Sequence, residues 1–577
     1  MATIASAIVA GLLCLLPVTA QIQYKETIWS SVIFTRYGER TPLILPEQNV
    51  LTPLGAQQLY SAGSTFRRRY IAQPSGSFGR NSGIRGISTY EIDSTQVYAM
   101  STVDEFVVAS AQAFVQGLYP PLSASSNNTI LNSMSVLANG SNIDFPLGGY
   151  QYPQIYTASE LDPNSIWLAG VVNCPAYSIS GAEYFNTQEF VQTSVTNNDF
   201  YKGLESSILR GELPHSTLGY HNAYNIFDYL NYGYTHNRTV TNNLSPSDLA
   251  KARMLADQWV YSMNGNISAN GYVSGDRIRT IAGQTMAAEI VGLLFNNIET
   301  GGVADKINLL FGSFEPFVAF AALARLPSLN TNFYGLPDFG SSMVFEMFSV
   351  DVNNSGTYPG IDELNVRFLF RNGTNATSEL ISYPLFGRDP SQTDMTLQDF
   401  LEGMEGIMLP SIGDWCHTCG SVSIFCSVYT GNTNSRGSNS SSSSHHSSGL
   451  KPAVAGVIGA IVALAIAGLL LAVAMLLGGI RVYRMKMKRR SELGGFKGGE
   501  KLASDQDLTH GKGGSGAKVS NIERNRVGSW ELGESDKAGG ANLRAPNRPA
   551  SMRRPSSDDD DVSVNPFSEP VKADERV

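Results

Sequence analysis

Apolar positions follow alternating strand-like and helix-like patterns between residues 25 and 430. Two apolar runs have the length and composition of buried strands, at residues 28–34 and 307–316. Three further segments have helical character: residues 54–70, 102–118 and 318–324. The first of these begins after Thr52-Pro53, with a proline in its first turn. A strand, a Gly-containing loop and a helix at both ends of this stretch predict an α/β fold, in which ligands bind at the carboxyl ends of strands.

Apolar segments near both ends of the chain predict secretion and membrane insertion. Residues 1–20 combine an apolar run with a small-residue site, which is typical of a secretory signal peptide. Residues 452–480 carry no charge and are long enough to cross a bilayer. Basic side chains are concentrated in residues 481–490, directly after this segment. The positive-inside rule therefore places this flank in the cytoplasm and the preceding residues outside the cell or in a lumen.

The predicted segments divide the chain into five parts. They are a signal peptide at 1–20, a globular ectodomain at 21–430, a Ser-rich stalk at 431–451, a transmembrane helix at 452–480 and a disordered tail at 481–577. This order predicts a single-pass, type I protein of the plasma membrane or of a secretory or vacuolar endomembrane.

Charge and short motifs restrict the expected partners. The formal net charge is −9, and residues 481–577 hold 19 Lys+Arg against 15 Asp+Glu, so the ectodomain is acidic. An acidic ectodomain argues against nucleic acid as its partner. In the tail, Asn565, Pro566 and Phe567 match a short endocytic motif and predict a cytosolic adaptor as a partner. No pattern predicts a metal or a cofactor, since His445-His446 lies in the stalk as part of a solvated linker.

Glycosylation sites and cysteines agree with this topology. Sequons begin at nine positions, and none follows the predicted span: Asn127, Asn139, Asn237, Asn243, Asn266, Asn353, Asn372, Asn375 and Asn439. Four cysteines remain once the signal peptide is removed: Cys174, Cys416, Cys419 and Cys426. On the oxidising side of a membrane they predict two disulfides, for which three connectivities are open. We expect the C-x-x-C of Cys416 and Cys419 to be structural, because no thioredoxin-like pattern surrounds it.

Candidate chemistry lies directly after the first predicted strand. The sequence there is Thr35-Arg36-Tyr37-Gly38-Glu39-Arg40-Thr41-Pro42. Two arginines on a Gly-containing loop form a plausible clamp for an oxyanion, because the planar guanidinium fork matches the geometry of phosphate. Arg36 and Arg40 are therefore the candidate anion-binding residues.

This loop resembles the Arg-His-Gly-x-Arg-x-Pro signature of the histidine acid phosphatases, with Tyr37 in place of the histidine. Residues 51–59 resemble the helix start that follows in that family. Residues 110–121 resemble its "SAQAFLQGLYPP" block, and residues 311–315 take the place of its Gly-His-Asp turn. The resemblance covers most of residues 25–430. It implies a phosphoglycerate-mutase-like α/β core with a smaller, mainly helical cap.

The resemblance also implies a role for each site position. The motif histidine is the nucleophile, three arginines and a second histidine hold the phosphate, and an Asp protonates the leaving group. In this chain Arg36 and Arg40 are kept, the nucleophile position is Tyr37 and the third arginine is Met100. The second histidine is Phe314 and the acid is Glu315. A phenol ionises near pH ~10 and needs a base to act as a nucleophile, so we expect the site to be catalytically inactive.

Three functions remain open at this point. The first is a noncatalytic membrane glycoprotein that binds a phosphorylated or other anionic ligand, senses it, or serves as a scaffold. The second is an active phosphomonoesterase that uses an atypical nucleophile, and the third is a purely structural surface protein. Arg36 and Arg40 either hold an anion or form internal ion pairs with Glu39 or Glu315, and the sequence does not separate these uses.

Overall fold

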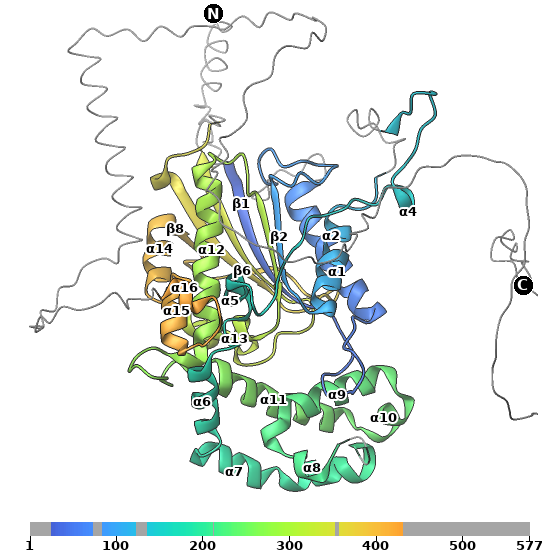
Figure 1. Ribbon diagram of the computed structural model, residues 1–577, viewed down its shortest axis with the longest axis vertical. Coiled ribbons are helices and arrows are strands. Elements are labelled where there is room, and N and C mark those ends of the chain that lie inside the picture. Colours follow the sequence, from blue (N-terminus) through green and yellow to red (C-terminus); the bar gives the residue numbers. More distant parts are fainter. Residues whose placement is uncertain are drawn as a thin grey trace, which may run out of the picture. The chain divides into compact units, whose positions relative to one another are not determined.

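The computed structural model describes residues 25–72, 83–122, 135–209, 211, 213–351 and 357–430. All of them lie in the first of the two units into which the chain divides, Met1–Ser442. This part is a mixed α/β structure with helices on both sides of a central sheet (Figure 1).

The sheet runs in the order β3-β2-β4-β1-β5-β6-β7, and β8 pairs with β6. Its strands are β1 (Lys25–Arg36), β2 (Val97–Thr102), β3 (Tyr156–Ala158), β4 (Ile307–Gly312), β5 (Ser342–Asp351), β6 (Leu364–Arg371), β7 (Ile381–Tyr383) and β8 (Asp394–Thr396). Strands β1 to β4 are mutually parallel, whereas β5 is antiparallel to β1 and β6 is antiparallel to β5. The carboxyl ends of β1, β2 and β4 therefore meet at one edge.

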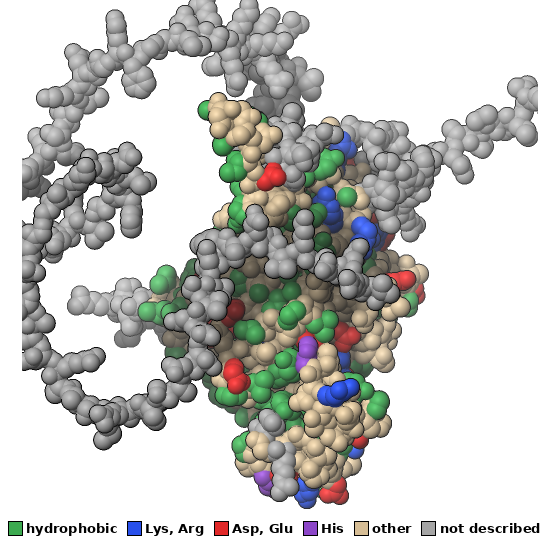
Figure 2. Space-filling model, turned by 90° about the vertical axis from the view of Figure 1, so that its right-hand side faces the viewer, with side chains coloured by type: hydrophobic (Ala, Val, Ile, Leu, Met, Phe, Trp, Pro, Cys, Tyr) green, Lys and Arg blue, Asp and Glu red, His purple; other side chains and the backbone are tan. Residues whose placement is uncertain are grey.

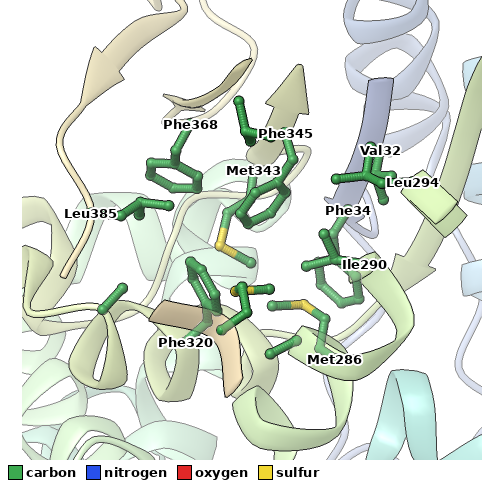
Figure 3. Packing of buried hydrophobic residues seen from close by; sticks show 14 of the residues in the cluster. Val32, Phe34, Met286, Ile290, Leu294, Phe320, Met343, Phe345, Phe368 and Leu385 are labelled. Carbon is green, nitrogen blue, oxygen red and sulfur yellow. The ribbon is translucent and has the colours of Figure 1, made fainter. Parts of the chain in front are cut away.

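Both faces of β1 are buried, which explains its continuous apolar run. Val32 and Phe34 pack into a core on one face, beneath α12 (Ile281–Glu299), α13 (Glu315–Leu323) and α14 (Leu397–Glu405). Figure 3 shows ten labelled members of this core. Ile33 points the other way, into a core with α1 (Pro53–Phe66) and α2 (Glu105–Leu118). Alternation with a period of two along the strand divides its side chains between these cores.

A mainly helical part lies at one end of the sheet (Figure 1) and has its own apolar core. Its helices are α6 (Pro175–Tyr184), α7 (Gln188–Thr196), α8 (Asn198–Leu204), α9 (Ala223–His236), α10 (Arg238–Asn243) and α11 (Pro246–Asn264). The remaining short helices are α4 (Pro146–Gly149), α5 (Ile166–Ala169), α15 (Ile412–Cys419) and α16 (Cys426–Tyr429). On the face that Figure 2 draws, acidic and basic side chains are dispersed among uncharged ones.

The predicted strands and helices are confirmed, with shifted boundaries. The helix expected at 54–70 is α1, and its last turn continues as a π-helical turn at Arg67–Ile71. The side chain of Thr52 caps α1 by accepting the Gly55 amide. The helix expected from Thr102 begins only at Glu105, because Thr102 is the last residue of β2. The run at 307–316 divides into β4 and the start of α13.

The four cysteines form two disulfides, as predicted. Cys174 is bonded to Cys419 and Cys416 to Cys426, which selects one of the three connectivities. The C-x-x-C pair is thus divided between two different bridges, and these bridges join α15 to α16 and to the start of α6.

One described helical stretch, Ile278–Glu299, is long and apolar enough to cross a membrane, but 72% of its most apolar window is buried inside the protein. The predicted signal peptide, stalk, span, tail and adaptor motif lie outside the described residues. Of the sequon asparagines, Asn139, Asn237, Asn243 and Asn375 are exposed and Asn266 and Asn372 are half-buried. Asn127, Asn353 and Asn439 are outside the described ranges.

Two glycines set the close approach of α1 and α2. A Cβ on Gly63 would lie 1.9 Å from the carbonyl oxygen of Phe114, and one on Gly117 would lie 2.1 Å from that of Tyr60. Both obstructing atoms belong to the backbone, so a larger side chain would have to push the helices apart. Gly292, on α12, has no atom within 4 Å of such a Cβ.

We expect Gly63→Ala to lower the free energy of unfolding by about 1–3 kcal/mol, because the added methyl group overpacks the α1–α2 contact. Gly292→Ala should raise it by roughly 1 kcal/mol, since alanine is the better helix former where space is open. Denaturant unfolding of both variants checks this. An unchanged or higher stability for Gly63→Ala would contradict the close-packed geometry.

Candidate functional site

Three loops at the carboxyl ends of neighbouring parallel strands form the candidate site. The arginine loop follows β1, which ends at Arg36, and Phe314 follows β4. Phe106 lies in the first turn of α2, after β2. This is the edge of an α/β sheet at which ligands bind. The helical part adds α9 to it, through Tyr224 and Asp228.

Both terminal nitrogens of Arg40 have partners within the protein, whereas its buried Nε has no hydrogen-bond partner among the described residues. Arg40 is 1% exposed, and its Nη1 lies 2.8 Å from Oδ2 of Asp228. The same nitrogen donates to the carbonyl oxygen of Thr41 at 3.0 Å, and Nη2 donates to the hydroxyls of Tyr37 (3.3 Å) and Tyr224 (3.1 Å). Burial by itself would lower the pKa of Arg40, but the oxygens of Tyr37, Asp228 and Tyr224 outweigh it and raise the pKa above its ordinary value.

Tyr37 fills the position that the resemblance gives to the nucleophile. Its side chain is buried, with its ring edge-on to Phe106 at 4.8 Å between centroids and tilted against Phe339 at 6.0 Å. Burial opposes ionisation of the phenol, but the positive charges of Arg40 and Arg36 outweigh it and hold the pKa of Tyr37 below its ordinary value. The neighbouring Tyr224 has the opposite shift, since burial and the oxygens of Tyr37 and Asp228 raise its pKa.

Arg36 lies among aromatic rings. Its guanidinium carbon is 4.5 Å from the ring centre of Phe339, 5.3 Å from that of Tyr37 and 5.5 Å from that of Phe314. Nη1 donates to the carbonyl oxygen of Pro337. Its buried Nε has no hydrogen-bond partner in the part of the chain that the structure describes. Arg36 is 4% exposed, so ring faces and one carbonyl provide most of its stabilisation.

Phe314 and Glu315 lie beside the arginines. Phe314 contacts Tyr224 at 4.8 Å between ring centroids and caps α13, whose first residue is Glu315. Burial raises the pKa of Glu315, against the lowering effect of a hydrogen bond from Ser313 and of the arginine charges. The carboxyl is therefore suited to hold a proton.

Met100, which the resemblance places at the third arginine, packs into a different core from Tyr37. Alternation along β2 places Ala99 in the core that contains Tyr37, whereas Met100 packs into the core on the other face of the sheet. Phe106 occupies the space beside Tyr37 and Arg40, with its ring centre 5.5 Å from the Arg40 guanidinium carbon. The sequence analysis missed Phe106 because it started the helix at Thr102 and gave no separate role to its first turn.

The ion pairs also differ from those considered from the sequence. Arg40 pairs with Asp228 and not with Glu39 or Glu315, and within the described ranges no ion pair involves Arg36. Glu39 turns away from the arginines, because it accepts from the Thr52 hydroxyl at 2.9 Å and lies 2.5 Å from Nε2 of His236. No described histidine forms a hydrogen bond with Tyr37, Arg36 or Arg40. The described residues also contain no group of three or more His, Cys, Asp or Glu side chains that could hold a metal.

Comparison with known proteins identifies the family to which this domain belongs. Residues 29–370 match the model of the histidine phosphatase superfamily, branch 2. No curated protein sequence matches the chain.

The solved structures to which this chain is similar include a phytase from Klebsiella sp. ASR1, at 13% identity and a TM-score of 0.43, covering 67% of this chain and 97% of that one. A phytase from D. castellii has 14% identity and a TM-score of 0.40, covering 72% of this chain and 86% of the other. The multiple inositol polyphosphate phosphatase of Bifidobacterium longum, solved with phosphate, has 13% identity, a TM-score of 0.38 and coverages of 67% and 94%.

We expect Asp228→Asn to lower the free energy of unfolding by about 3–5 kcal/mol, because it leaves the charge of Arg40 buried without a counter-ion. Thermal and denaturant unfolding provide the measurement. Asp199→Asn is the matched control: its carboxylate is exposed and 4.0 Å from Lys202, so we expect little change. Replacing both partners, as in Arg40→Met with Asp228→Leu, should recover most of the loss. Equal effects of the two Asp→Asn changes would show that the buried pair is not required.

Proposed function

Because the chain belongs to the histidine phosphatase superfamily, branch 2, and carries Tyr37 at the position of the motif histidine, we propose that it is a noncatalytic member of this superfamily. It acts by binding or scaffolding, not by hydrolysis. One observation carries this proposal: Asp228, Tyr37 and Tyr224 already accept hydrogen bonds from both terminal nitrogens of Arg40, with which an anion would be held.

Each requirement for phosphoryl transfer is weakened at this site. A nucleophile must reach phosphorus, but Tyr37 is 3% exposed and lies between aromatic rings. An oxyanion clamp needs free donors, but Arg40 already holds a carboxylate and two phenol oxygens. Glu315 has a raised pKa and could protonate a leaving group, yet an acid without a nucleophile does little.

The topology proposed for this protein follows from the sequence. The apolar segment 452–480 and its basic flank support a single-pass glycoprotein of the plasma membrane or an endomembrane, with the described domain outside or luminal. The motif Asn565-Pro566-Phe567 supports contact between the tail and a cytosolic adaptor. A domain that has lost its chemistry would then present a binding surface on one side of the membrane and recruit adaptors on the other.

A second candidate function is the binding of a phosphorylated or other anionic ligand without cleavage. It is favoured by Arg36, whose guanidinium has no carboxylate partner among the described residues and whose Nε lacks a hydrogen bond. Ring faces do not neutralise its charge, so an incoming anion would gain a charge-assisted contact. Active hydrolysis is favoured only by the lowered pKa of Tyr37.

We expect the purified full-length protein not to hydrolyse p-nitrophenyl phosphate at any pH from acidic to neutral. The matched control is Tyr37→Phe, which removes the phenol oxygen at the nucleophile position and keeps the ring packing. Arg36→Ala reports contaminating phosphatase, and unfolding curves confirm that both variants fold. Hydrolysis that disappears in Tyr37→Phe would refute the proposal and identify a tyrosine nucleophile.

We also expect inorganic phosphate to leave the unfolding temperature unchanged relative to chloride at equal ionic strength, because Asp228 already occupies Arg40. Differential scanning calorimetry of the full-length protein is the measurement. A phosphate-dependent increase that disappears in Arg36→Ala would instead establish the second candidate function.

A further inference from the structure

A second cleft lies away from the arginines, at the edge of the sheet where β3 pairs with β2. Its volume is about 250 Å³. Met100 contributes to its floor, and its polar and aromatic lining consists of Tyr98, Tyr156, Asp162, Asn164, Trp167 and Glu289. None of these residues belongs to the arginine site, and Met100 faces the opposite core from Tyr37. The cleft is therefore distinct from the cluster of Tyr37, Arg40 and Asp228.

Glu289 gives the cleft an uncompensated acidic group. It projects from α12, whose neighbouring residues Met286 and Ile290 are part of the apolar core. Among the described residues it has no hydrogen bond or ion pair, and burial raises its pKa to about 7. A partly buried carboxylate without a partner is costly, so a ligand that supplies positive charge would be stabilised there.

Aromatic side chains form much of the remaining lining. The rings of Tyr98 and Tyr156 stack with centroids 5.4 Å apart, and Trp167 adds a third ring. Burial and then the charge of Glu289 raise the pKa of Tyr98, so this phenol stays neutral. Aromatic rings next to a carboxylate recognise organic cations. The carboxylate pairs with the positive charge, and the ring faces attract the alkyl groups that surround it.

Other ligand classes fit this lining less well. An anion would be repelled by Glu289 and Asp162, and a neutral apolar molecule would leave the Glu289 carboxylate without a partner. Asp162 is already engaged, because its Oδ1 accepts the Asn164 amide at 2.8 Å. A hard metal ion would need several oxygen ligands.

We propose that this cleft binds a small alkylammonium group, with its charge on Glu289 and its alkyl surface against Tyr98, Tyr156 and Trp167. Two sources supply such a positively charged, alkyl-substituted nitrogen: a quaternary amine, either free or in a lipid headgroup, and a lysine side chain. The cleft is open to them, because Tyr156 is 48% exposed and Asn164 is exposed.

Affinity for a cation should depend on pH through Glu289. The other titratable groups that line the cleft are Tyr98 on β2, Tyr156 on β3 and Asp162 in the turn before Pro163–Ser165. Protonation of Glu289 as the pH falls through about 7 removes the negative charge that holds the ligand. Binding should therefore be strong above this pH and weak below it.

Isothermal titration of the full-length protein with choline tests the proposal, with 3,3-dimethylbutan-1-ol as the neutral molecule of the same shape. We expect choline to bind about tenfold or more tightly than the alcohol, and Glu289→Gln to weaken choline binding by a similar factor. Glu299→Gln is the matched control, because it makes the same change at an exposed position of α12 and should leave the affinity unaltered. Between about pH 8 and about pH 6 the affinity of the unmodified protein should fall about tenfold.

A parallel titration with N-acetyl-lysine methylamide distinguishes the two sources, and tighter binding of either amine supports the proposal. The proposal is overturned if neither amine binds, if the neutral alcohol binds as well as choline, or if Glu289→Gln binds choline like the unmodified protein. The comparison of choline with the alcohol uses only the unmodified protein, so it remains decisive even if Glu289→Gln fails to fold.

Discussion

A guanidinium that is removed from water needs partners that compensate for its lost hydration, and the site described above is arranged around this requirement. Arg40, in the loop after β1, obtains its counter-ion from Asp228 on α9, so the pair joins the sheet to the helical part of the molecule. The same carboxylate oxygen accepts the amide of Leu43 at 3.1 Å and so fixes the next turn of the loop. Tyr37 and Tyr224 complete the cluster by accepting from the other nitrogen. These contacts restrict the loop, and the charge of Arg40 is already paired with the carboxylate of Asp228.

The aromatic side chains around Arg36 and Arg40 act together. Tyr37, Phe106, Phe314 and Phe339 place rings around two buried arginines, and each ring contributes cation–π attraction where a phosphate would have contributed charge. A histidine lost alone would leave a polar cavity. Here aromatic side chains and the carboxylate of Asp228 surround the two arginines and stabilise them inside the protein.

The parts of this arrangement that sequence could predict are those with a local signal. The strand β1 and helix α1 follow from apolar spacing and a Thr-Pro start, and the loop motif places Arg36, Tyr37 and Arg40 together. Phe314 and Glu315 follow from the resemblance at the end of β4. Met100 could not be placed correctly without the register of β2, since moving one residue along a strand reverses the face. Asp228 and Tyr224 are far from Arg40 in the sequence, on a helix whose residue pattern predicts only an apolar face. Their contact with Arg40 therefore cannot be predicted from the sequence and is seen only in the structure.

The two disulfides have a mechanical consequence. A pull on the chain beyond Thr430 reaches Cys426 first, passes through the bridge to Cys416, and continues from Cys419 to Cys174. This covalent path bypasses the long loop between Cys174 and Cys416, which contains the helical part and strands β4 to β8. Tension applied from that end cannot stretch those elements while both bridges are intact. Reduction of the Cys174–Cys419 bridge would open this path and expose the helical part and strands β4 to β8 to the same tension.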